Sequence, residues 1–268
     1  MLAPQELYDI PPDDTVLWRY MDLASLLWML SEKALLFTWP INFEDAFEGQ
    51  FTRQQVEEMR AWEGEVGEQN RSFFASSPFP IAVSCWHEHP AESAIMWKAY
   101  GGTASVAVRT SVGNVRASLP SGAIISRIKY IDHEVDTYDY GNVIHPYVHK
   151  RLVYQHEQEV RVMLVGKDAM ADDLIDCGQK GIAHLIKPDL LLDEIVVGPQ
   201  IGAWFTGPLQ KIAADLGFAG SVRASRVSDE PYLLYKQVSV TALVPWELAD
   251  KVTVPRYIHI KAQPESNG

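Results

Sequence analysis

Segments typical of β-strands alternate along this chain with segments typical of amphipathic helices, and this alternation restricts the fold more than any other feature. Residues 16–20 and 34–38 are expected to be strands. Asp22 stands where the N-cap of an intervening helix is expected. Within that helix, leucines recur at the spacing of a single face, at Leu23, Leu26, Leu27 and Leu30. Chains that mix the two kinds of element in this way form mixed α and β folds.

The same patterns continue toward the C-terminus. Further strands are expected over residues 81–86, 105–110, 124–131, 159–165, 195–197 and within 221–240. Further helices are expected over 52–62, 90–100, 147–156 and 208–216, the first with a Thr52/Gln55 capping box. We therefore predict an α+β fold, with a single domain over residues 1–250, a split and mostly antiparallel sheet flanked by helices, and a loosely ordered tail over 251–268.

Composition excludes several classes of protein. The 268 residues are 47% hydrophobic and include eight tryptophans, which is enough apolar mass for a globular core and excludes a disordered chain. The formal net charge of −12 disfavours non-specific binding to a nucleic acid backbone. No stretch approaches the about 20 apolar residues of a membrane span, and no signal peptide is recognised at the N-terminus, so we expect a cytoplasmic protein. Cys85 and Cys177 are too few for a disulfide framework.

Residues 157–161 (Glu-Gln-Glu-Val-Arg) are the most informative stretch for chemistry. On a strand, side chains two apart share a face, so Glu157, Glu159 and Arg161 would lie together. Arg161 can keep one carboxylate ionised while repulsion raises the proton affinity of the other, which is an arrangement typical of acid–base catalysis. Two alternatives remain open. The strand can be exposed and carry ordinary ion pairs, or Glu157 can close the preceding helix, in which case the two acids would not share a face.

Arg19 lies on the first expected strand between Trp18 and Tyr20, where a guanidinium could hold an anion such as a pyrophosphate. The alternative is an ion pair with one of the many acids. In the loop after the second strand, Asp45 and Glu48 could coordinate Mg²⁺, although such residues also form turn hydrogen bonds.

A third cluster consists of His87, His89 and Glu92, which could in principle bind zinc. The sequence has no HExxH pattern and no cysteine in register, so we expect no metal. It also lacks the GxSxG, P-loop and GxGxxG patterns, which disfavours serine hydrolases, P-loop proteins and Rossmann enzymes.

Three stretches together resemble family 2971 of the domains of unknown function, which occurs in prokaryotes. They are residues 17–20 with the helix after them and residues 42–49, residues 83–86 with 92–101, and residues 150–151 through 157–161. Ala46 replaces the proline that this family usually has after the aspartate. The family carries no established activity.

A more distant resemblance is to ADP-ribosyltransferase-like toxins, whose layout has an arginine on the first strand, a serine or threonine on the second and Glu-x-Glu later. Arg19, Thr38 and residues 157–159 match these places, although the serine–threonine–serine triplet is absent because Thr38 precedes Trp39 and Pro40. The resemblance implies NAD as substrate, no metal, and a role in toxicity or phage defence.

The resemblance also implies roles for individual residues. Glu159 would hold a ribose hydroxyl and stabilise an oxocarbenium-like cation. Glu157 would orient or deprotonate an acceptor, either a protein or a nucleic acid. Arg19 would grip the pyrophosphate, Tyr20 or Trp86 would stack on nicotinamide, and Thr38 and Arg161 would complete the nucleotide site.

Two other functions compete with this hypothesis. One is a non-catalytic binding or sensor domain, in which Trp86, Trp97 and Tyr100 are core or interface residues. The other is a metal-dependent nuclease that uses Asp45, Glu48 and Glu157.

Overall fold

The computed structural model describes residues 8–65, 67–69, 80–139, 142–171, 174–229, 242–244 and 260–262, and the statements below concern these residues. The chain divides into two units, Met1–Val227 and Ser228–Gly268. In the second unit, β13 (Ala242–Val244) pairs in parallel with β14 (Ile260–Ala262). The expected domain boundary at residue 250 and most of the expected tail fall outside the described residues.

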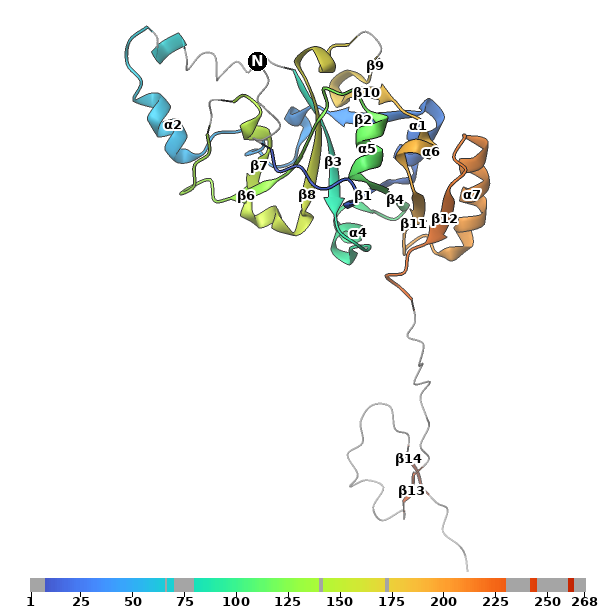
Figure 1. Ribbon diagram of the computed structural model, residues 1–268. Helices are drawn as coiled ribbons and strands as arrows, with labels where there is room; N and C mark the ends of the chain where they lie inside the picture. The colour runs from blue at the N-terminus through green and yellow to red at the C-terminus, as the bar shows by residue number, and fades with distance from the viewer. Residues whose placement is uncertain are drawn as a thin grey trace, which may run out of the picture. The chain divides into compact units, whose positions relative to one another are not determined.

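A ten-stranded sheet forms the centre of the first unit (Figure 1). Its main path is β12 (Ser221–Ala224), β11 (Glu194–Val197), β4 (Ser105–Ser111), β1 (Val16–Asp22), β3 (Ile81–Glu88), β2 (Ala34–Thr38), β10 (Gly181–Leu185) and β9 (Ile175–Asp176). β8 (Glu159–Val165) pairs with β3, and β5 (Ile124–Arg127) pairs with β8. The β11–β12 pair of this sheet is parallel and the other pairs are antiparallel.

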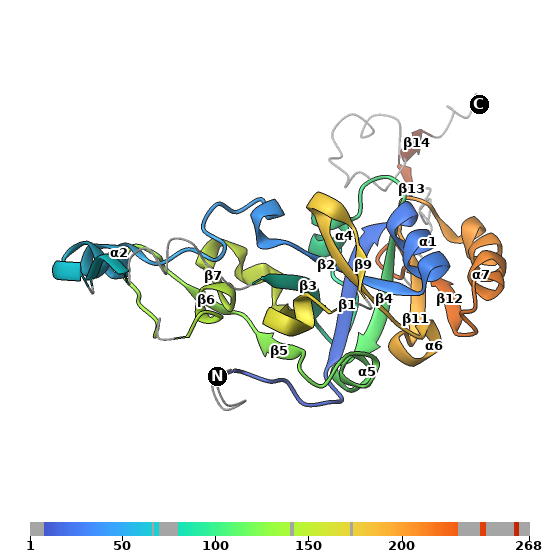
Figure 2. The ribbon, with the colours of Figure 1, turned by 90° about the horizontal axis from the view of Figure 1, so that it is seen from above.

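Helices flank this sheet, so the predicted α+β class with a mostly antiparallel sheet is confirmed. The α-helices are α1 (Leu23–Glu32), α2 (Arg53–Arg60), α4 (Ala94–Tyr100), α5 (Val112–Ser118), α6 (Pro188–Leu191) and α7 (Thr206–Asp215). Figures 1 and 2 place α1, α5, α6 and α7 around the β4–β11–β12 end, and α2 on the far side of β3 from that end. There, β6 (Lys129–Ile131) and β7 (His149–Arg151) form a separate parallel pair. Within the described ranges no helix is long and apolar enough to cross a lipid bilayer.

The sheet is split where β1 and β2 meet β3. β8 occupies one edge of β3 from Ile81 to His87, so β1 and β2 share the other edge. β2 reaches it only at Val83, and β1 only at His87 and Glu88. The residues of β3 between these points therefore have no strand beside them on that edge, and the split opens a space next to β3.

Apolar side chains anchor the strands that border this split. Val160, Val162 and Leu164 on one face of β8 belong to the main core cluster, together with Trp86 and Leu35. Met163 and Val165 project to the other face and join a smaller cluster. The strand predicted over residues 159–165 is confirmed.

Local capping agrees with the sequence at several helices. The Asp22 side chain accepts the Ser25 backbone N–H at the start of α1, and Thr52 and Gln55 form the predicted capping box of α2. The helix expected from Pro90 instead begins at Ala94, because the Ser93 side chain caps it by accepting the Met96 N–H. The strand expected over 124–131 is divided, because the Lys129 N–H turns away from β8 and donates to Val148.

The prediction of a helix over residues 147–156 is wrong. The segment consists of the 3₁₀ turn η3 (His145–Tyr147), strand β7 and the 3₁₀ turn η4 (Leu152–Glu157). Pro146 lacks an N–H and favours a short turn, and β7 then pairs with β6. The remaining 3₁₀ turns are η2 (Pro40–Asn42), η5 (Gly166–Ala169), η6 (Gly178–Lys180) and η7 (Ala203–Phe205).

Candidate functional site

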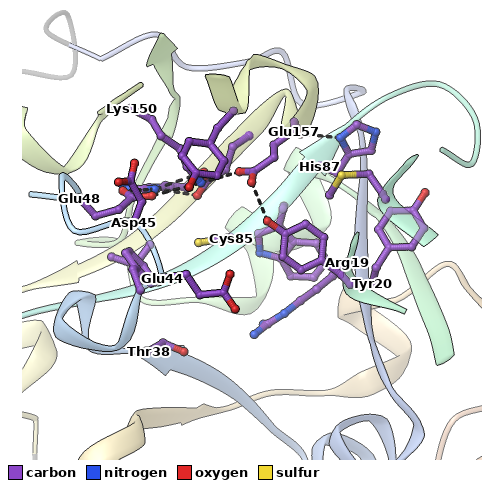
Figure 3. A pocket seen from close by; sticks show the side chains of 18 of the residues that line it. Arg19, Tyr20, Thr38, Glu44, Asp45, Glu48, Cys85, His87, Lys150 and Glu157 are labelled. Carbon is purple, nitrogen blue, oxygen red and sulfur yellow. Dashed lines mark hydrogen bonds and ion pairs between the residues drawn. The ribbon is translucent and has the colours of Figure 1, made fainter. Parts of the chain in front are cut away.

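A cavity of about 370 Å³ lies at the split between β1, β2 and β3 (Figure 3). Every residue that the sequence placed in the nucleotide site lines it, namely Arg19, Tyr20, Thr38, Trp86, Glu157, Glu159 and Arg161. These residues come from β1, β2, β3, η4 and β8, so the cavity gathers segments that are far apart in the chain.

The Arg19 side chain lies in the split and donates hydrogen bonds to neutral groups. Its guanidinium donates to the Ser84 hydroxyl at 2.8 Å and to the Leu36 carbonyl at 3.4 Å, so it bridges β3 and β2. Within the described part of the chain, no carboxylate oxygen lies within 4.0 Å of it, so the expected alternative of an ion pair is not observed. Burial lowers the pKa of Arg19, although a guanidinium stays charged at neutral pH. Arg19 is therefore a cation on the cavity wall that has no counter-ion among the described residues.

Glu159 and Arg161 share one face of β8, as the two-residue spacing predicts. The Arg161 Nε donates to Glu159 at 2.6 Å, and its NH2 group donates to Glu48 at 2.6 Å. All three side chains are buried. Burial works to raise the pKa of Glu159, but the adjacent Arg161 and Lys150 outweigh it and lower that pKa to about 2. Glu159 is thus held as a carboxylate at neutral pH.

Glu157 joins the same cluster, although it does not lie on the strand that carries Glu159. It ends η4 and lies outside the strand, and Gln158 adopts a left-handed conformation (φ 41°) before β8 begins. The open alternative, in which Glu157 closes the preceding helical segment, is therefore the one observed. One Glu157 carboxylate oxygen accepts the Tyr100 hydroxyl at 2.6 Å, and the other accepts Lys150 at 2.5 Å. Lys150 then brings Glu157 and Glu159 together, as it also donates to Glu159 at 3.1 Å.

Lys150 is the hub of a buried ionic cluster that the sequence analysis did not identify. Its ammonium lies within 3.1 Å of carboxylate oxygens of Glu48, Glu157 and Glu159. Burial lowers the pKa of Lys150, but the surrounding carboxylates, Glu159 first, raise it well above its ordinary value. Within the described part of the chain, the cations that contact these three glutamates are Lys150 and Arg161, so the cluster carries a formal excess of one negative charge. Its members are up to 113 residues apart, and no local pattern signals the pairing.

Aromatic rings line the cavity on the side of β1 and α4. Tyr20 is held by the Ser93 N–H, which donates to its hydroxyl at 2.8 Å, and by edge contact with Trp97. Burial raises the pKa of Tyr20 to about 12. Trp86 is 2% exposed and packs in the main core, with Arg19 5.8 Å from its ring. Tyr100 is 48% exposed and presents the most accessible of these rings, a feature that sequence reasoning missed.

The residues considered for metals are engaged with other groups. Asp45 pairs with Arg151 at 2.7 Å, and Glu48 pairs with Lys150 and Arg161, so cations of the chain occupy the positions expected for Mg²⁺. Glu92 binds Arg223 and Ser225. Across the described segments, no three histidine, cysteine, aspartate or glutamate side chains are grouped to hold a metal.

His87 lines the cavity beside Glu157. Its Nδ1 lies 2.5 Å from the Glu157 carbonyl, and this contact fixes Nδ1 as the donor and the end of η4 against β3. Burial lowers the pKa of His87, which favours the neutral ring. The contact positions the backbone that carries Glu157.

No family model and no curated protein matches the chain. One solved structure that the chain matches is that of the Thermus sp. 2.9 DarT in complex with ADP-ribosylated single-stranded DNA. The match has a TM-score of 0.38 and 12% sequence identity, and it covers 82% of this chain and 98% of the DarT chain.

Proposed function

We propose that this protein is an ADP-ribosyltransferase-like enzyme that uses NAD⁺ as its substrate. The reaction breaks the bond between nicotinamide and ribose and transfers ADP-ribose to an acceptor on a protein or nucleic acid. One observation carries the proposal: Arg19, a cation without a carboxylate partner in the described part of the chain, lines the same cavity as Glu157 and Glu159.

Arg19 is suited to the pyrophosphate. Of the three cations that line the cavity, Lys150 and Arg161 each contact at least two carboxylates. Among the described residues, the hydrogen-bond partners of Arg19 are a hydroxyl and a carbonyl and no carboxylate contacts it, so its charge is available to an anionic ligand. A guanidinium binds phosphate oxygens through paired N–H donors, and partial burial strengthens that interaction.

The ionic cluster is suited to the cation that forms during the reaction. As the bond breaks, its electron pair leaves with nicotinamide and positive charge develops on the ribose. The cluster of Glu48, Glu157 and Glu159 with Lys150 and Arg161 holds one excess negative charge at fixed positions. Fixed negative charge in a site that excludes water stabilises such a cation without reorganisation.

The cavity also offers an aromatic surface and a volume typical of a small-molecule site. Its volume of about 370 Å³ falls in the range of roughly 300–1,000 Å³ typical of small-molecule sites. The exposed Tyr100 ring can stack on nicotinamide, and the Tyr20 ring, held by Ser93, can support the opposite wall. Thr38 at the end of β2 supplies a hydroxyl on the side where Arg19 lies (Figure 3).

Nicotinamide release from NAD⁺ by the purified protein tests the proposal. We expect the wild type to release nicotinamide. Glu159→Gln should lower kcat by about 100-fold or more. Arg19→Lys keeps the charge but loses the paired donors, so it should raise the KM for NAD⁺ by about 10–100-fold. Glu57→Gln is the matched control, because Glu57 is an exposed residue of α2 outside the cavity. Circular dichroism of each variant establishes that it is folded at the assay temperature.

Four outcomes separate the alternatives. NAD⁺ binding without release favours the sensor domain, and the absence of both binding and release contradicts the proposal. Chelator-sensitive cleavage of nucleic acid favours the nuclease. Growth arrest upon expression that Glu159→Gln relieves supports a toxic role.

A further inference from the structure

We infer that Glu44 is a further catalytic residue of this site, the general base that takes the proton from the acceptor. The inference rests on the proposed function and refines it, because the sequence assigned this role to Glu157. Glu44 lies on the loop between η2 and α2 and lines the same cavity.

Glu157 is poorly placed to accept a proton. One of its oxygens accepts the Tyr100 hydroxyl at 2.6 Å, and the other accepts the Lys150 ammonium at 2.5 Å. Both oxygens are therefore already engaged by donors of the protein, and Tyr100 or Lys150 would have to move before Glu157 could contact an entering acceptor.

Glu159 is still more constrained. Arg161 donates to both of its oxygens, at 2.6 and 3.2 Å, and Lys150 adds a third contact. Its side chain is 5% exposed. Glu159 can supply negative charge, but its oxygens have no room for a proton from a bound acceptor.

Glu44 differs from both residues in exposure and in its contacts. It is exposed, and among the described residues no hydrogen bond or ion pair engages its carboxylate. Figure 3 shows its side chain extending from the loop toward the middle of the cavity, on the side of Thr38 and Arg19 and apart from the Glu157–Lys150 contact. Its oxygens are therefore open to a group that enters the cavity from solvent, as a macromolecular acceptor must.

The step balances as a simple displacement. The bond between nicotinamide and the ribose anomeric carbon breaks, and its electron pair leaves with the neutral nicotinamide. A lone pair of the acceptor O–H or N–H group forms the new bond to that carbon. The acceptor proton passes to a Glu44 carboxylate oxygen, which is then a neutral acid until it releases the proton to water.

Hydrolysis of NAD⁺ tests this role without knowledge of the natural acceptor, because water serves as the acceptor. We expect Glu44→Gln to lower kcat for nicotinamide release by about 100-fold, the lower end of a general-base effect, and to leave the KM for NAD⁺ unchanged. The activity of Glu44→Ala should rise with added formate, which can replace the missing carboxylate at an open site. Glu57→Gln again controls for the loss of one negative charge from an exposed position.

The outcomes are distinct from those of the proposed function. A wild type that releases no nicotinamide overturns both proposals. An active wild type with unchanged kcat in Glu44→Gln overturns the role of Glu44 alone, and so does formate rescue of Glu157→Ala without rescue of Glu44→Ala. A lower kcat that formate restores in Glu44→Ala supports the inference, since a residue with a merely structural role would not respond to formate.

Discussion

The Arg19 guanidinium donates to the Ser84 hydroxyl at 2.8 Å across the point where β1 and β2 part beside β3. Ser84 is fully buried, and its β3 segment has no strand beside it on that edge. The arginine therefore satisfies polar groups of the split sheet while it keeps its charge available to the cavity. The Arg19–Ser84 hydrogen bond therefore both links β1 to β3 and positions the guanidinium at the cavity wall.

Ser84→Ala should consequently affect both stability and ligand binding. A hydrogen bond to a charged group contributes about 1.5–3 kcal/mol, so the free energy of unfolding should fall by about that amount, and NAD⁺ affinity should also fall. Urea denaturation and calorimetry measure the two effects. Ser118→Ala is the matched control, because the Ser118 hydroxyl is buried without a partner among the described groups. Equal effects of the two substitutions on stability would contradict the role of the Arg19–Ser84 contact.

The buried ionic cluster should be sensitive to the loss of a single member. Arg161→Met leaves Glu159 and Glu48 without their main partner, and removing one side of a buried pair costs about 3–5 kcal/mol. Denaturant unfolding checks this value. The exposed Arg116–Asp13 pair provides the comparison, since Arg116→Met should cost less than about 1 kcal/mol. A small effect at both positions would show that the cluster contributes little to stability.

His149 should make the protein less stable in mild acid. Burial lowers the pKa of His149 to about 4, below the value of 6.5 for an unperturbed histidine. Between these values the unfolded chain binds more protons than the folded chain, so stability is retained above pH 6.5 and is lost as the pH falls toward 4. His149→Phe keeps the stacking surface beside Tyr138, 4.3 Å away, and should reduce the slope of melting temperature against pH in that window. An unchanged slope would contradict this assignment.

Glu92 should anchor the strand β12 to α4. Its carboxylate accepts hydrogen bonds from Ser225, Arg223, Trp97 and the Arg226 backbone. Burial opposes ionisation, but these bonds, from Ser225 first, lower the pKa of Glu92. Its stabilising contribution is therefore present above the ordinary glutamate pKa and is lost as the pH falls through the lowered value. Glu92→Gln should increase hydrogen exchange in β12, and unchanged exchange there would show that this network does not hold the strand.

Local sequence patterns predicted the elements that depend on neighbouring residues. The cap at Asp22, the capping box of α2 and the alternating face of β8 follow from hydrogen bonds and side-chain directions within a few residues. The same reasoning failed over residues 147–156, where β7 forms only because β6 lies beside it. A pairing partner elsewhere in the chain outweighed the local preference for a helix.

The sequence by itself determined the α+β class and the residue types that line the cavity. Tertiary structure alone decided which charges are paired and which remain free. Lys150 contacts three glutamates because separate segments meet at the split. Among the described residues, the hydrogen-bond partners of Arg19 there are a hydroxyl and a carbonyl. The physical reason is that electrostatic pairing depends on distance and burial in space, and strand register across the sheet sets both.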